Sequence, residues 1–153
     1  MSTWRAVVGD WLRRHPLRAV LVALGASTAL AGVAEVLAPA LVLTLLGAQP
    51  TPLATQLFAT VGLFMIVVGG LLTQSLLRKT PHRDVVLWSG VQKAGAVLAV
   101  CLGVLNGVFG AIALLVAAFD LVTAALLYVY WRRLRSRIVS RRPVAPQPND
   151  DRS

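Results

Sequence analysis

Two apolar stretches with a charged residue inside each decide the fold, in the run VVLWSGVQKAGAVLAVCLGVLNGVFGAIALLVAAFDLVTAALLYVYW (residues 85–131). Lys93 lies near the middle of residues 85–104, and Asp120 lies near the middle of residues 107–131. A helix that crosses a hydrocarbon core of about 30 Å needs about 20 predominantly apolar residues, and both stretches reach that length. Because only a short loop joins them, the two predicted helices are antiparallel neighbours.

Two further apolar segments precede this run. Residues 19–38 and 52–77 are each long enough to cross a bilayer, and Glu35 is the only charged residue in either segment. Residues 39–47 are apolar but too short to cross, so we expect a short interfacial or re-entrant piece there. The sequence therefore predicts an all-α fold, an integral membrane four-helix bundle that spans residues 16–134.

The composition excludes an ordinary soluble domain. Of the 153 residues, 57% are hydrophobic and only 14% are charged, whereas soluble domains average about 45–50% and about 25%. The mean hydropathy is +0.73. The net charge of +9 comes from residues that flank the apolar segments. Such placement is typical of a membrane topology signal, so we do not expect nucleic acid as a partner.

The residue types also exclude several kinds of chemistry. Cys101 is the only cysteine, so the chain cannot form an intramolecular disulfide or a cluster of thiolate ligands. His15 and His82 lie among basic residues outside the apolar segments, which argues against a membrane-embedded haem. We therefore expect neither a metal site nor another cofactor.

The two ends of the chain are predicted to lie outside the bilayer core. Residues 1–15 are predicted to form an amphipathic interfacial helix, with a disordered basic tail as the alternative. The apolar face of that helix contains Trp4, Val7, Val8, Trp11 and Leu12. Residues 135–153 are first basic and then rich in proline, which predicts a disordered cytoplasmic tail.

The basic residues predict the orientation. They occur in the N-terminal arm, in the second loop and in the tail, and are absent from the first and third loops. Positively charged loops stay in the cytoplasm, so both termini are predicted to be cytoplasmic. We expect a multi-pass protein of the cell (inner) membrane.

Lys93 and Asp120 are predicted to form an ion pair inside the membrane. At the rise of an α-helix they lie roughly 15 and 18 Å from the cytoplasmic edge, on neighbouring antiparallel helices. An ionisable group at this depth is costly, and it therefore suggests a functional site. The alternative is a pair that only fixes the packing of the two helices.

Glu35 is expected elsewhere, roughly 25 Å from the cytoplasmic edge and near the extracytoplasmic boundary. Thr28 shares its helix face, and Gln56, Thr60 and Asn106 are predicted at a similar height. These four polar residues are candidates for ligand binding in an outward-facing vestibule. The alternative is that Glu35 reaches the interface and stays solvated there.

Ladders of small residues predict close helix packing. They comprise Gly25, Ala29 and Gly32 in the first segment, Gly62 and Gly69 in the second, and Gly95, Ala99 and Gly103 in the third. The third ladder points away from Lys93. We expect it to pack against another helix of the bundle or a second protomer.

Several of these segments resemble a known group of proteins. Residues 35–39 with Gly47, residues 62–70, residues 90–93 and Asp120 are similar to small bacterial four-helix membrane proteins of the DoxX-like and neighbouring uncharacterised families. The resemblance implies a left-handed four-helix bundle and a membrane location. It implies no settled activity, and no catalytic residue is carried over from it.

Hypotheses of different classes follow for the function. In the first, the bundle binds a lipophilic small molecule between its helices, with Lys93, Asp120 and Glu35 at the polar end. These three are then candidate catalytic residues, which isomerise or cyclise the ligand by acid–base chemistry. The alternatives are an accessory subunit of a membrane complex and a proton-coupled transporter of the small-multidrug type. The expected partners are the lipid bilayer, a lipophilic ligand, and a second copy or another membrane protein.

Overall fold

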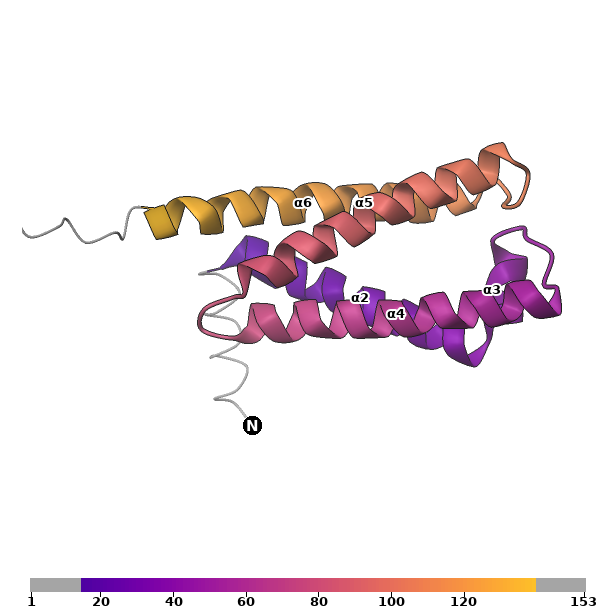
Figure 1. The fold of residues 1–153 in the computed structure, drawn as a ribbon, viewed down its shortest axis with the longest axis horizontal. Helices are drawn as coiled ribbons and strands as arrows, with labels where there is room; N and C mark the ends of the chain where they lie inside the picture. The colour runs from indigo at the N-terminus through magenta and orange to yellow at the C-terminus, as the bar shows by residue number, and fades with distance from the viewer. Residues whose placement is uncertain (1–14, 140–153) are drawn as a thin grey trace, which may run out of the picture.

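A computed structural model of the chain describes residues 15–139 (Figure 1). Within these residues there are α-helices and no strands. The helices are α2 (Pro16–Leu37), α3 (Pro39–Leu45), α4 (Pro52–Leu77), α5 (Arg83–Leu105) and α6 (Ala113–Val139). The predicted interfacial helix and the proline-rich part of the tail lie outside the described residues. Helix α6 runs to Val139, beyond the predicted end of the bundle at residue 134.

Four of these helices, α2, α4, α5 and α6, are long and apolar enough to cross a membrane. At most 28% of the most apolar window of each helix is buried inside the protein. Large side chains such as Leu30, Leu98 and Leu115 are about 70% exposed, at 70%, 67% and 70%. An outer surface this apolar is compatible with lipid and not with water. The all-α fold is confirmed, and the chain is a small multi-pass membrane protein.

Prolines set where α2, α3 and α4 begin, and the Thr51 side chain also caps the start of α4. Pro16, Pro39 and Pro52 each begin a helix, a position where the missing N–H costs nothing. Pro39 also prevents Ala38 from staying helical, so α2 ends at Leu37 and α3 continues in a new direction. The predicted short piece between the first two spans is therefore a separate helix.

The long helices pack as two pairs, α2 with α4 and α5 with α6 (Figure 1). The first pair is held by close backbone contact at its glycines. A Cβ atom built on Gly69 would lie 2.7 Å from both Ala29 N and Gly25 O. One built on Gly62 would lie 2.7 Å from Gly32 O. The small-residue ladders predicted in these two helices are therefore confirmed as a packing face.

The two pairs are joined at both ends of the bundle. At the end where α2 begins and α4 ends, here called the basic end, one cluster of apolar side chains draws on all four long helices. Its buried members are Leu21, Leu72, Leu76, Val86 and Leu127. At the opposite end, here called the α3 end, the Gly110 amide donates a hydrogen bond of 2.8 Å to Leu46 O.

An arginine reinforces the basic end. The Arg18 guanidinium donates to the carbonyl oxygens of Leu76 and Arg78. These carbonyls lie at the C-terminal end of α4, where no amide N–H of the helix is available to them. A cation at a helix C-terminus also interacts favourably with the helix dipole. The start of α2 is thereby fixed against the end of α4.

One prediction about the hairpin of α5 and α6 is wrong, and a second keeps only one of its two alternatives. Helix α6 begins at Ala113 and not near residue 107, because Gly107 adopts a φ of +70° and turns the chain out of the helix. The third ladder packs against no other long helix in the described residues, so its packing on a second protomer stays a prediction. A Cβ on Gly95 would meet nothing within 4 Å, Ala99 is exposed, and Gly103 packs only on the Phe109 ring of its own hairpin.

Adjacent glycines in α4 provide a test of the first helix pair. We expect Gly69→Ala to destabilise the protein by about 1–3 kcal/mol, because the new methyl meets backbone atoms of α2 that cannot move separately. Gly70→Ala is the matched control, since a Cβ there meets nothing within 4 Å. Thermal unfolding in detergent measures both. Equal losses in the two variants would show that α2 and α4 do not approach as described.

Candidate functional site

The centre of the site is an ion pair between α5 and α6. Lys93 Nζ lies 2.5 Å from Asp120 Oδ1, and the two side chains are only 5% and 7% exposed. The predicted pairing is confirmed. It follows from geometry, since antiparallel helices joined by a short loop place residues of equal depth side by side.

Small and aromatic residues of α6 shape the surroundings of the pair. Ala113 and Ala117 are buried on the face of Asp120 and let α5 approach closely. The Phe119 ring lies 5.6 Å from Lys93 Nζ, within the range of a cation–π contact. Thr123 is fully buried but donates its hydroxyl to Phe119 O at 2.8 Å. It is therefore satisfied within its own helix.

Glu35 belongs to the same site. It interacts electrostatically with both Lys93 and Asp120, although it lies in the other helix pair. Its Oε2 atom is buried and has no hydrogen-bond partner. Burial of an unpaired carboxylate oxygen is costly in an apolar interior. The site thus contains one balanced ion pair and one carboxyl group with a vacant acceptor.

Contact with α4 gives the height of Glu35 in the bundle. A Cβ on Gly62 would lie 2.7 Å from Glu35 Cβ, so the two residues are level. Gly62 lies about 15 Å along α4 from Pro52, at a helical rise of about 1.5 Å per residue. Glu35 is therefore well inside the bundle. Gly62 also lies about 24 Å along α4 from Arg78 at the basic end, close to the distance predicted for Glu35 from that edge. The place of Glu35 relative to a membrane boundary stays a prediction.

The four predicted ligand-binding residues do not form one vestibule. Thr28 is buried and donates its hydroxyl to Leu24 O at 3.0 Å. Gln56, Thr60 and Asn106 are exposed, and the Thr60 hydroxyl donates to Gln56 O at 3.0 Å. None of the four lines the cavity described next. A role for them in ligand binding stays a prediction.

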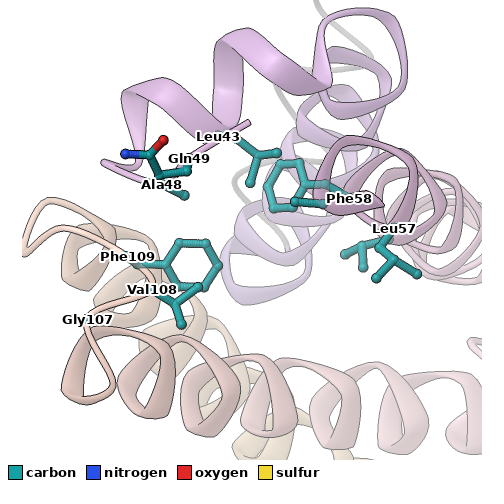
Figure 2. A pocket seen from close by; sticks show the side chains of 10 residues that line it. Leu43, Ala48, Gln49, Leu57, Phe58, Gly107, Val108 and Phe109 are labelled. Atoms are coloured by element: carbon teal, nitrogen blue, oxygen red, sulfur yellow. The ribbon is translucent and has the colours of Figure 1, made fainter. Parts of the chain in front are cut away.

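A cavity of about 330 Å³ lies at the α3 end (Figure 2). It lies between the first helix pair and the loop that joins α5 to α6, with Leu43 and Phe58 on one side and Phe109 on the other. Its lining is almost entirely apolar and ends on α4 at Val61. Val61 directly precedes Gly62, the residue packed on Glu35. Its inner limit is thus close in height to the carboxyl group.

Sequence reasoning missed this cavity and one polar residue. The cavity walls come from α3, the first turns of α4 and two loops, and nothing local in the sequence links Phe58 with Phe109. Gln92 lies beside Lys93 in α5, and its Oε1 atom is buried without a hydrogen-bond partner. An amide in the middle of an apolar segment is a signal that identifies it.

Comparison with known proteins gives no relative: no family model, curated protein or solved structure matches the chain. None of these comparisons tests the resemblance to DoxX-like proteins, which stays a prediction from short sequence segments. Within residues 15–139, no group of three or more His, Cys, Asp or Glu side chains is placed to hold a metal ion.

Single and double substitutions of the ion pair test its energetic role. We expect Lys93→Met alone or Asp120→Leu alone to cost about 3–5 kcal/mol of stability, the range for an unpaired buried charge in water-soluble proteins. The double variant should lose less than either single variant. Unfolding in detergent gives the values, with Lys79→Met, an exposed lysine, as the control. Additive losses in the two single variants would mean that the charges do not interact.

Proposed function

We propose that the protein binds a lipophilic small molecule whose polar head donates a hydrogen bond to Glu35. The observation that carries the proposal is the buried, unpartnered Oε2 atom of this residue beside the Lys93–Asp120 pair. An acceptor without a partner is satisfied by a donor, so a hydroxyl or amine head is favoured over a carboxylate head. The cost of the unpaired oxygen is recovered when such a ligand binds.

A cavity near Glu35 is large enough to hold the apolar part of the ligand. The cavity of about 330 Å³ at the α3 end is at the lower limit of the roughly 300–1,000 Å³ of small-molecule sites. Leu43, Phe58 and Phe109 offer it apolar and aromatic surface. A hydrocarbon chain in this cavity would extend from the inside of the bundle toward the membrane surface.

Helix packing supports a route into the site. The contacts between the two helix pairs are far fewer than those within each pair. At the α3 end, the Gly110–Leu46 hydrogen bond is a small connection compared with the apolar cluster at the basic end. A small separation of the pairs at that end gives a lipophile access from the bilayer.

Acid–base chemistry is a further part of the proposal. One Asp120 oxygen is engaged by Lys93, whereas Glu35 has a vacant oxygen, so Glu35 is the stronger candidate for the general acid or base. Lys93 and Asp120 then orient the polar head of the ligand. Isomerisation or cyclisation of a lipophile is the reaction class that such a site suits.

A second candidate function is that of an accessory subunit in a membrane complex. Gly95 and Ala99 are exposed small residues on α5, and a Cβ built on Gly95 would meet nothing within 4 Å among the described residues. Faces of this kind let a transmembrane helix approach another closely. A second copy or a different membrane protein is a suitable partner.

Native mass spectrometry with three probes of equal chain length tests the ligand proposal. Dodecylamine and 1-dodecanol should bind, and dodecanoic acid, whose ionised head offers no donor, should not. Glu35→Gln should weaken dodecylamine binding by about tenfold or more, because a hydrogen bond to a charged group is worth about 1.5–3 kcal/mol. Asp84→Asn, which removes an exposed carboxylate at the basic end, should leave binding unchanged. Equal binding of all three probes would overturn the proposal.

We further propose that the basic end faces the cytoplasm of the cell (inner) membrane, so that both termini are cytoplasmic. Reporter fusions after Lys79 and after residue 142 should then report the cytoplasm. A fusion after Gln49, in the loop that follows α3, should report the opposite side. An extracytoplasmic signal from the C-terminal fusion would contradict this orientation.

A further inference from the structure

A cluster of arginine and aromatic side chains lies at the basic end, roughly 15 Å along α5 and α6 from the charged site. The Arg83 guanidinium, at the start of α5, lies 5.0 Å from the centre of the Trp131 ring on α6. The Arg135 guanidinium lies 6.0 Å from the same ring. Tyr128 stacks on Trp131 at 6.1 Å and has Arg132 at 6.0 Å from its own ring. Several cations are thus held on one aromatic platform.

This platform carries a large excess of positive charge. The basic side chains at this end are Arg18, Arg78, Lys79, Arg83, Arg132, Arg133 and Arg135. Among residues 15–139, Asp84 is the only carboxylate at the same end. Like charges held close together repel unless an anion lies between or beside them.

Two hydrogen-bond donors in the cluster have no acceptor. Arg83 Nε and Trp131 Nε1 are both buried and both lack a hydrogen-bond partner. They belong to side chains that contact each other, and Arg83 as a whole is only half-buried. Both unpaired atoms are donors. The missing group is therefore an acceptor, and the surplus of cations favours one with negative charge.

From this arrangement we infer that Arg83, Trp131 and Arg135 bind the phosphate of an anionic phospholipid. The site lies where the apolar segments of α5 and α6 meet the basic end, which is the level of lipid headgroups. Guanidinium groups bind phosphate oxygens in a bidentate manner, and tryptophan is favoured at this depth. If the Arg83 side chain shifts, phosphate oxygens can accept hydrogen bonds from both unpaired donors, Arg83 Nε and Trp131 Nε1. The inference does not depend on Glu35 or on the proposed ligand.

Nanodiscs of phosphatidylcholine with and without phosphatidylglycerol test this site. Native mass spectrometry after release from the discs should find phosphatidylglycerol retained in preference to phosphatidylcholine. Arg83→Gln and Trp131→Phe should each weaken retention by about tenfold, since a charge-assisted hydrogen bond is worth about that factor. Trp131→Phe keeps an aromatic ring but removes the indole N–H with the five-membered ring that carries it, so it serves if Arg83→Gln fails to fold.

Arg133→Gln is the matched control, because it removes an equal charge from an exposed side chain two residues, and about 200° around α6, from Trp131. It should leave retention unchanged. An equal loss in Arg133→Gln and Arg83→Gln would mean attraction by the overall charge, and the site would be overturned. Inorganic phosphate added to the detergent-solubilised protein separates the two sources of the group. If it stabilises the protein as much as phosphatidylglycerol does, the lipid assignment is wrong.

Discussion

The structure depends on one constraint, that a charge inside a hydrocarbon layer needs a partner. Lys93 and Asp120 meet this constraint through their contact of 2.5 Å, which joins α5 to α6 at a defined height. Because removal of one partner leaves the other unpaired, the contact also fixes the register of the two helices.

The first helix pair is held together by close backbone packing and not by an ion pair. Helices α2 and α4 touch through backbone atoms, because glycines remove the side chains that would hold them apart. That close approach fixes the height of Glu35, whose Cβ packs against Gly62. One helix pair thus provides a balanced ion pair, and the other provides a carboxyl group with a vacant acceptor.

The two ends of the bundle differ in how firmly they join the pairs. The basic end combines an apolar cluster with an arginine that caps α4, whereas the α3 end relies on a backbone hydrogen bond beside a cavity. An arrangement closed at one end and hollow at the other suits exchange of a lipophile with the bilayer. The proposed ligand site and the proposed phosphate site lie toward opposite ends of the bundle and share no residue.

The sequence alone determined the four long helices, the short α3 between the first two, and the Lys93–Asp120 pair. These features depend on hydropathy and spacing along the chain, which the thickness of a bilayer converts directly into structure. Only the tertiary structure decided the contact of Glu35 with Gly62, the exposed face of Gly95 and the cavity between Phe58 and Phe109. Each of these depends on which helix faces meet and where α2 ends, and such contacts join residues that no local pattern connects.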